Sequence, residues 1–446
     1  MPKIFHEIRD PIHVFIRLDS HERSVLDSRA FQRLRYVHQL AMTFLVYPGA
    51  THKRFEHSLG VMELATRVFD VITDPDHIYH EEIRKHFPEI SNKDEKAYWR
   101  RVLRMAALCH DLGHLPFSHA AEKSLLPEGW DHERITKDLI LSEEMKKVWE
   151  KVKPPLMPDD VVKLAVGVKK AVPGVVFSEW ETILSEIIVG DAFGVDRMDY
   201  LLRDSYHAGV AYGRFDHYRL IDTLRILPPP ASGNKDKEHS TEPSLGVEEG
   251  GIQSAEALAL ARYFMFSQVY FHAVRRIYDI HLKDFLLEYL EGGHFPTDLE
   301  KFLLLTDNEI ISAMRSACNN SALPGHTHSD LILNRKHFKI LYGRIPDDIV
   351  VNPSAPKMIY QATVEKYGDT KVRYDSYRQS GGDIDFPVFE RDGSVVSSTS
   401  VSALLQQLKP IAIDFVFADR SIFNAAETWL KENKSKIIAI KGGEAK

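Results

Sequence analysis

The stretch from Leu103 to His119, LRMAALCHDLGHLPFSH, carries the pattern that decides how this chain folds. Its first half is apolar and suits a buried helix, and Gly113 and Pro116 indicate where that helix ends. The helix therefore brings the adjacent His110 and Asp111 to its C-terminal end. An unpaired imidazole and carboxylate are costly away from water, and a divalent cation satisfies both. The stretch thus predicts a metal site at the end of a buried helix.

The composition narrows the class of protein. The 446 residues can bury a large core and suffice for one large domain or for two to three ordinary ones. A net charge of -7, from 57 basic and 64 acidic residues, gives no general attraction to polyanions and argues against a dedicated nucleic-acid-binding protein. Only Cys109 and Cys318 occur, which excludes a disulfide framework. With no signal-like start and no long apolar run, we expect a cytoplasmic location and no membrane partner.

Hydrophobic periodicity predicts a mainly α-helical protein with a smaller α+β part at its C-terminal end. Ile, Val and Phe around Asp10-Pro11 predict a short N-terminal β-hairpin. A polar loop is expected at residues 228–252. Helices are predicted within residues 20–45, from about 55 to 69, within 181–204, from 255 to 290 and from 421 to 432. Strands are predicted at residues 357–367, 371–377 and 411–417.

Four candidate metal ligands come from three separate predicted helices. They are His57, the pair His110 and Asp111, and Asp196. Two imidazoles and two carboxylates make a site suited to Mn, Fe, Zn or Ni, with positions left open for water or a phosphate oxygen. Such a metal polarises a phosphoryl oxygen and lowers the pKa of bound water. The ligand set therefore favours phosphoester hydrolysis.

Further polar residues surround these ligands in the sequence. His114 lies one helical turn from His110, and together with His119 and His132 it could bind a phosphate, donate a proton to the leaving oxygen, or do both. Glu122, three residues after His119, is placed to orient that imidazole; the alternative is a solvated glutamate on a helix surface.

A second polar set lies further along the chain. Asp196, Tyr200 and Asp204 stand at i, i+4 and i+8, so their side chains share one helix face. A face with two carboxylates and a phenol is not a core stripe.

These motifs resemble the HD-domain phosphohydrolases, whose signature is H…HD…D. The extended motifs resemble the deoxynucleoside triphosphate triphosphohydrolase branch, which includes dGTP-activated members. They read FQRLRYVHQL at residues 31–40, HKRFEHSLGV at 52–61, HDLGHLPFSH at 110–119 and DRMDYLLRD at 196–204. The resemblance covers residues 4–290 and is weak beyond them. It implies a helical HD catalytic core over residues 1–300, an α+β region over 301–446, and cleavage of dNTPs at the α-phosphorus to deoxynucleoside and inorganic triphosphate.

The resemblance also implies roles for single residues. The metal ligands it implies are His57, His110, Asp111 and Asp196, and the catalytic group is His114, His119, Glu122 and His132. The family usually has Asp where Glu122 stands. Arg54 and Arg197 match phosphate contacts, and Arg197 is often Lys in relatives; arginine keeps the charge and adds bidentate geometry, so we expect binding to survive. Mg is expected to accompany the nucleotide triphosphate.

Other matches concern the deoxynucleoside. Gln39, Leu40 and Asp204 match residues around the sugar 3'-hydroxyl, and Tyr200 packs where a ribose 2'-hydroxyl would lie. An aromatic wall without an acceptor would reject ribonucleotides. Tyr278 is a candidate for stacking on the base, with a core aromatic as the alternative.

An activator site is implied by three further matches. Asp27, Gln32 and Arg35 stand where activated members bind a nucleotide, although His6 occupies a position where some relatives have lysine. The expectation is activation by a dGTP-type nucleotide and a homo-oligomer, either a dimer or a tetramer.

Three hypotheses compete at this point. The first is a metal-dependent dNTP triphosphohydrolase, the second a nucleotide phosphomonoesterase or phosphodiesterase that uses the same metal, and the third a nucleotide- or nucleic-acid-binding regulator with a residual HD site. Inorganic triphosphate would appear only in the first case, and the regulator would bind ligand without turnover. The sequence leaves open the native metal, the preferred base and which histidine acts as the acid.

Overall fold

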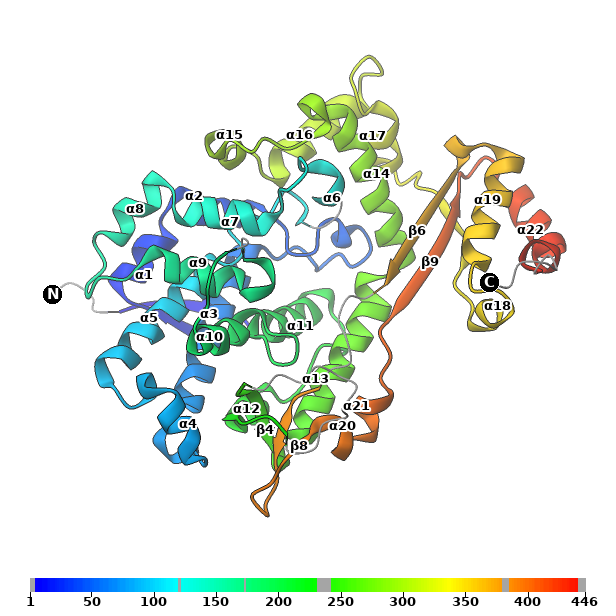
Figure 1. Cartoon of the computed structure of the whole chain (residues 1–446). Coiled ribbons are helices and arrows are strands. Elements are labelled where there is room, and N and C mark those ends of the chain that lie inside the picture. Colours follow the sequence, from blue (N-terminus) through cyan, green and yellow to red (C-terminus); the bar gives the residue numbers. More distant parts are fainter. Residues whose placement is uncertain (1–4, 119–121, 172–173, 231–241, 379–384, 440–446) are drawn as a thin grey trace. The chain divides into compact units, whose positions relative to one another are not determined.

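The structure is a computed structural model that describes residues 5–118, 122–171, 174–230, 242–378 and 385–439. Helices dominate, with a two-stranded hairpin at the N-terminal end and two small sheets in later segments (Figure 1). The predicted fold class is therefore confirmed. Within the described residues no helix combines the length and the apolar character that crossing a bilayer requires.

The described residues form two compact units, each built from several chain segments. The first unit holds residues up to 265 together with 295–308 and 385–409, and the second holds 266–294, 309–378 and 410–439. These units are interleaved in sequence. The division into a catalytic core over residues 1–300 and a C-terminal region stays a prediction.

The N-terminal hairpin of the first unit pairs β1 (His6–Asp10) with β2 (Val14–Leu18) in antiparallel register, as the sequence predicted. The segment after it is helical but interrupted. It contains α1 (Ser20–Leu26), α2 (Arg29–Arg33) and two 3-10 turns, Leu34–Tyr36 and Thr43–Leu45. Ser28 divides α1 from α2 because its hydroxyl accepts from the Phe31 amide and caps the second helix.

Three long helices carry the predicted ligands and pack together. They are α3 (Arg54–Ile72), α5 (Lys93–Cys109) and α11 (Val195–Ala208), with α3 in contact with both others. Helix α3 buries residues around most of its circumference, as expected of a central helix. Helix α5 ends with His110 as its C-cap residue, which confirms the expected position of the His-Asp pair.

The first unit contains further helices. They are α4 (Glu81–His86), α6 (Glu122–Leu125), α7 (His132–Ile140), α8 (Glu143–Trp149), α9 (Pro158–Val166), α10 (Glu179–Val189), α12 (His217–Asp222), α13 (Ile252–Met265), α15 (Leu299–Leu303), α20 (Ser398–Val401) and α21 (Ala403–Gln407).

A four-stranded sheet completes the first unit. Its strands are β3 (Leu224–Leu227), β4 (Ser244–Glu248), β7 (Pro387–Phe389) and β8 (Val395–Ser397), in that order, and β4 runs parallel to β7. The expected loop at 228–252 is therefore wrong in part, because β4 and the start of α13 lie within it. Residues 231–241 of that loop lie outside the described residues.

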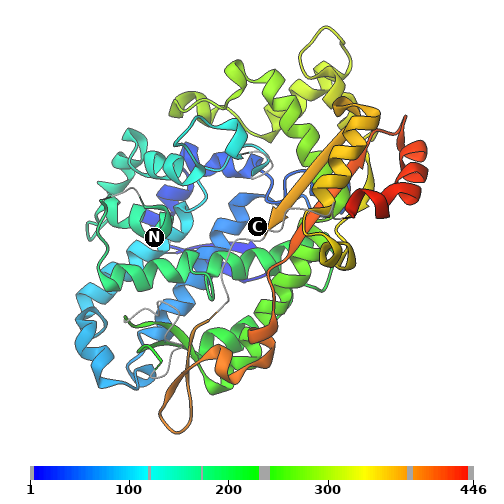
Figure 2. The same ribbon diagram turned by 45° about the vertical axis from the view of Figure 1, so that its right-hand side comes forward.

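The second unit is built around a three-stranded antiparallel sheet in the order β5, β9, β6. Its elements are α14 (Ala273–Tyr289), most of α16 (Asp307–Cys318), α17 (His326–Leu333), β5 (Lys339–Gly343), α18 (Pro346–Val351), α19 (Ala355–Tyr367), β6 (Val372–Arg378), β9 (Ala412–Ala418) and α22 (Phe423–Ile438). Helices α19 and α22 pack on each other and on the sheet (Figure 2).

Two sequence predictions were wrong in this part of the chain. The strand predicted at residues 357–367 is helix α19, in which Ile359 and Thr363, four residues apart, are buried on one face. The run is rich in β-branched and aromatic residues, but its burial follows the helical repeat, so packing overrode propensity. The helix predicted from 255 to 290 is broken by the π-helical turn Phe266–Tyr270 between α13 and α14. The strands predicted at 371–377 and 411–417 are confirmed as β6 and β9.

Candidate active site

Three of the four predicted ligands bring their ligand atoms together. His57 Nε2 lies 3.0 Å from Asp196 Oδ1, and His110 Nε2 lies 3.6 Å from the same oxygen. His57 comes from the first turn of α3, His110 from the end of α5 and Asp196 from the first turn of α11. One atom from each lies within 4.8 Å of the others, and we call these three residues the metal trio.

The hydrogen bonds of the two histidines suit cation binding. His110 Nδ1 contacts the Ala107 carbonyl at 2.8 Å, and His57 Nδ1 contacts Asp199 Oδ2 at 2.8 Å. Oxygens of these kinds can only accept, so each Nδ1 donates and each Nε2 lone pair is left for another partner. His110 Nε2 is buried and makes no hydrogen bond to any described residue. The donor set therefore fits the divalent cation that HD domains bind.

Asp111, the fourth predicted ligand, lies beside the metal trio rather than within it. Its Oδ1 is 3.4 Å from His110 Nε2, and its Oδ2 is 3.7 Å from His57 Nε2. Arg54 Nη1 donates to the same Oδ2 at 2.5 Å, while Arg54 Nε donates to Ser118 Oγ at 2.9 Å. Both side chains are buried, so this ion pair holds an arginine against the ligands.

The charges of this cluster favour bound positive charge. Burial opposes ionisation of Asp111, yet Arg54 and the neighbouring histidines hold its pKa well below the usual value. Burial alone would lower the pKa of His57, but hydrogen bonds to Asp196 and Asp199 raise that pKa to about 10. The carboxylates around His57 thus stabilise positive charge at this position, which is what cation binding requires.

Beside the trio, two further histidines stack face to face. The rings of His114 and His132 lie 4.1 Å apart at an interplanar angle of 21°. His114 Nε2 is 3.1 Å from Asp111 Oδ1, and His132 Nδ1 is 2.6 Å from Glu122 Oε1. The sequence suggested that Glu122 orients His119; it contacts His132, and His119 lies outside the described residues.

The two stacked histidines differ in pKa. Burial, Arg54 and His132 hold the pKa of His114 well below its ordinary value. Burial also disfavours the charged form of His132, but the hydrogen bond with Glu122 outweighs it and raises the pKa. At neutral pH, His132 is therefore the better proton donor of the two, and His114 is neutral.

The residues matched to the sugar contacts form a separate hydrogen-bonded group. His52 Nε2 lies 2.7 Å from Asp204 Oδ1, and the backbone N–H of Gln39 donates to the His52 carbonyl at 3.0 Å. Leu40 is buried, and the Gln39 Oε1 atom makes no hydrogen bond to any described residue. No role was predicted for His52 from the sequence, although it is the first residue of the motif at residues 52–61, and this position could have marked it as a candidate site residue.

The matched activator residues make local contacts in the first unit. Arg35 Nε donates to Gln32 Oε1 at 2.9 Å, and the Arg35 guanidinium lies 3.5 Å from the ring centre of Phe55. Asp27 instead accepts from Arg23 Nε at 2.8 Å.

The base-stacking candidate, Tyr278, belongs to the second unit. Its ring is fully buried 4.8 Å from the His337 ring, which leaves no free face for a nucleobase in this conformation.

The sequence motifs assigned no role to the buried carboxylate of Asp199. It contacts the metal-trio member His57 and also His13 Nε2 at 2.7 Å, and Arg203 donates to both of its oxygens at 2.8 and 3.0 Å. Asp199 and Arg203 stand at i and i+4 of α11, and this spacing was the one signal that could have singled out Asp199.

The comparisons with known proteins identify the family of this chain. Residues 54–171 match the HD domain, and residues 215–346 match the HD associated region. A crystal structure of a hypothetical protein from Aquifex aeolicus is 34% identical with a TM-score of 0.75, over 96% of this chain and 100% of that chain. The chain therefore belongs to the HD-domain family, in the branch that joins an HD domain to an HD associated region.

Two relatives show which proteins this chain is similar to. The uncharacterized protein YwfO of Bacillus subtilis is 34% identical over 62% of this chain and 54% of its own length. The deoxynucleoside triphosphate triphosphohydrolase SAMHD1 of Mus musculus is 29% identical over 70% of this chain and 50% of its own length. This chain thus spans about half the length of each of these relatives.

Proposed function

We propose that this HD-domain protein is a metal-dependent hydrolase that cleaves dNTPs to deoxynucleoside and inorganic triphosphate. The observation that carries the proposal is the meeting of the metal trio with the Arg54–Asp111 pair and the stacked histidines in one buried cluster. A relative named deoxynucleoside triphosphate triphosphohydrolase supports the choice of substrate.

A bound divalent cation (Mn, Fe, Zn or Ni), with Mg on the nucleotide, would polarise a phosphoryl oxygen and lower the pKa of a water molecule.

Side chains of the protein bind the phosphate and transfer the proton. The Arg54 guanidinium, oriented by Asp111 and Ser118, offsets negative charge on the phosphate. His132, kept protonated by Glu122, donates its proton to the 5'-oxygen that leaves with the deoxynucleoside, and the proton of the consumed water restores it. His114, neutral and held by Asp111, is a hydrogen-bond partner for the same phosphate.

The same proposal assigns the sugar contacts. Asp204, held by His52, accepts the one proton of the 3'-hydroxyl, with Gln39 and Leu40 packed against the sugar. Tyr200 stands against the C2' position and disfavours a ribose, which carries an additional hydroxyl there. We further propose that a guanine deoxynucleotide binds at Asp27, Gln32 and Arg35 and promotes a homo-oligomer.

A product-resolved activity panel tests the proposal. Metal-loaded protein is offered each dNTP, with Mg or Mn and with or without dGTP, and products are separated by anion-exchange chromatography. We expect deoxynucleoside and inorganic triphosphate in equal amounts. Release of phosphate or pyrophosphate would instead identify a phosphomonoesterase or phosphodiesterase, and binding without turnover would identify a regulator. Asp111→Ala is the inactive control.

A further inference from the structure

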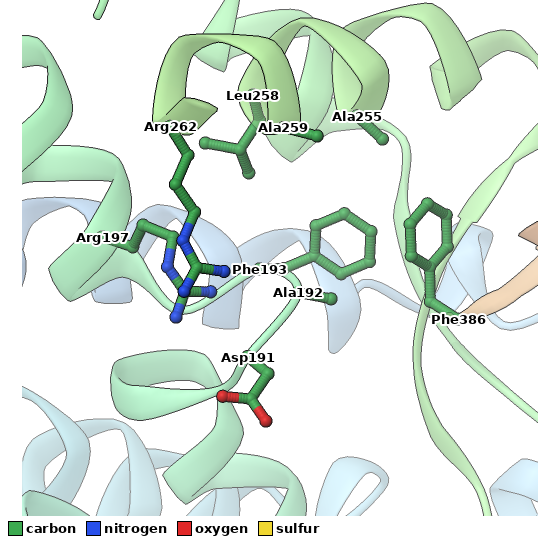
Figure 3. Close-up of a pocket in the computed structure, with 9 residues that line it drawn as sticks. All are labelled: Asp191, Ala192, Phe193, Arg197, Ala255, Leu258, Ala259, Arg262 and Phe386. Carbon is green, nitrogen blue, oxygen red and sulfur yellow. The ribbon is translucent and has the colours of Figure 1, made fainter. Parts of the chain in front are cut away.

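A small pocket of the first unit lies between the start of α11 and the side of α13. Figure 3 shows the side chains of Arg197 and Arg262 directed into one part of it, and the rings of Phe193 and Phe386 next to each other in another. The remaining wall is the apolar face of α13. The pocket thus combines two guanidinium groups with an apolar wall.

The charge of the lining is positive on balance. Asp191 is the one carboxylate among the described lining residues, and its charge interacts with Arg197 and Arg262 as well as with its ion-pair partner Lys169, which lies outside the pocket. Arg197 Nη1 donates to the Gly190 carbonyl at 3.3 Å, but its buried Nε makes no hydrogen bond to any described residue. Two guanidinium groups that share a small cavity repel each other, and a multivalent anion between them would turn that repulsion into attraction.

The pocket lies close to the metal trio along α11. Arg197 directly follows Asp196, a member of the trio, and Tyr200 stands one turn further along the helix. Burial raises the pKa of Tyr200, and the charges of Arg197, Arg262 and Asp196 each act on the same phenol. Tyr200 follows Arg197 by three residues and Asp196 by four on α11, so its side chain neighbours both, and one elongated ligand can contact the pocket and the trio.

The C-terminal third of the chain supplies part of the wall. Phe386, just before β7, packs edge-on against Phe193 with ring centres 4.6 Å apart. These rings keep water from one side of the cavity, and contacts between arginine and phosphate strengthen where water is excluded.

We propose that this pocket is a subsite for the terminal phosphate of a triphosphate chain, and that Arg262 joins Arg197 in binding it. The inference rests on the proposed function, because it takes the metal trio as the place of the first phosphate. It assigns Arg262 and Phe386, to which the sequence motifs gave no role, to recognition of triphosphates over monophosphates. Planar guanidinium groups suit this task since each can donate two parallel hydrogen bonds to one phosphate.

The test measures binding of inorganic triphosphate and of inorganic phosphate to the full chain by isothermal titration calorimetry. The variants are Arg262→Gln, Arg262→Lys and, as a matched control, Arg100→Gln, whose arginine pairs with Asp70 at the surface. We expect Arg262→Gln to weaken triphosphate binding about tenfold or more, as loss of a charge-assisted contact predicts, and Arg262→Lys to retain part of it. Binding of inorganic phosphate and the metal content should not change. In turnover, the KM for a dNTP should rise more than kcat falls.

The outcomes separate this inference from the proposed function. Triphosphate binding that depends on Arg262, in a protein that hydrolyses no dNTP, would support the subsite and refute the function. Wild-type protein that hydrolyses dNTPs while both Arg262 variants bind triphosphate normally would overturn the subsite alone. Failure of the wild-type protein to bind triphosphate would overturn it as well. If circular dichroism shows that Arg262→Gln is misfolded, Arg262→Lys and Phe386→Ala decide the question, because unchanged triphosphate binding in both would refute the subsite.

Discussion

Asp199 Oδ2 lies 2.8 Å from His57 Nδ1 and thereby directs the other nitrogen of that imidazole toward Asp196. Asp199 is itself held by His13 and Arg203, and Arg203 Nη1 donates to Asp10 Oδ2 at 2.8 Å. The side chains of Asp199, His57, His13, Arg203 and Asp10 are all buried. The turn of the N-terminal hairpin is thus tied through hydrogen bonds to a member of the metal trio.

We predict that Asp199→Asn lowers metal affinity. Loss of a carboxylate that orients a metal-bound histidine typically costs 10- to 100-fold, so we expect a decrease of about that size. The measurement is titration of the metal-free protein with Mn²⁺, followed by electron paramagnetic resonance. Asp10→Asn is the control, because it weakens the pair with Arg203 and leaves the contact between Asp199 and His57 in place. Equal losses of metal affinity in the two variants would argue that Asp199 acts only through stability.

Gly60 is expected to be intolerant of any side chain for a steric reason. A Cβ atom at this position of α3 would lie 1.9 Å from Asp199 Oδ1 and 2.5 Å from Arg203 Nη2. Gly60→Ala should therefore displace Asp199 and reduce metal affinity as well as stability. Gly129→Ala is the comparison, since Gly129 has a φ of +79° and no atom within 4 Å of a new Cβ. It should cost about 1 kcal/mol of backbone strain and leave metal binding unchanged. Normal metal binding by Gly60→Ala would refute the steric argument.

Removal of one ligand from the trio should release the metal without unfolding the protein. His110→Ala deletes the Nε2 atom, which has no hydrogen-bond partner among the described residues, together with one hydrogen bond from Nδ1 to the Ala107 carbonyl of the same helix, so the packing between helices loses little. We predict loss of bound metal, measured by inductively coupled plasma mass spectrometry, together with loss of turnover. Cys109→Ala changes the preceding buried residue of α5 and should keep both. A metal-loaded His110→Ala protein would contradict the ligand assignment.

The pH dependence of kcat should report on the contact between Glu122 and His132. Glu122 raises the pKa of His132, so in the wild-type protein the protonated acid persists to higher pH. Glu122→Gln removes the charge, and the alkaline limb of the kcat profile should move to lower pH, with the acidic limb unchanged. Glu133→Gln should move it less, because Glu133 Oε2 is 3.2 Å from His132 Nδ1 whereas Glu122 Oε1 is 2.6 Å away. An alkaline limb unaffected by either change would exclude His132 as the acid.

Acid should destabilise the second unit through His281. This imidazole is fully buried on α14, and burial, followed by His328 and Arg373, lowers its pKa to about 3. In the unfolded chain the pKa is near 6.5, so the unfolded state takes up the proton first as the pH falls. Stability is therefore complete above pH 6.5 and decreases from there toward pH 3.

Urea unfolding at several pH values tests this expectation. Between pH 7 and pH 4 the wild-type protein should lose free energy of unfolding, and replacing His281 with Gln should reduce that loss by an amount on the order of 2 kcal/mol. This amount is smaller than the upper limit that follows from the difference between the folded and unfolded pKa values. His294→Gln, at an exposed position, should leave the pH dependence as in the wild-type protein. A wild-type free energy of unfolding that does not change over this range would refute the prediction.

Local pattern was sufficient for much of the fold. The apolar repeats of α3, α5 and α11 and the hairpin around Asp10-Pro11 all depend on residues within a few positions of one another. The same local reasoning failed at α19, where β-branched and aromatic residues favoured a strand and burial along a helical face decided otherwise.

The candidate site, like the fold, could be predicted from the sequence only in part. The sequence by itself determined which residue types could bind a metal and a phosphate, and the HD motifs ordered them along the chain. Only the tertiary structure decided that Asp111 pairs with Arg54, that Glu122 contacts His132, that Asp199 holds His57, and that Arg262 shares a pocket with Arg197. The two residues of each pair come from different segments of the chain. The packing of the whole unit sets the distance between them, and residue spacing along a single helix or strand cannot predict that distance.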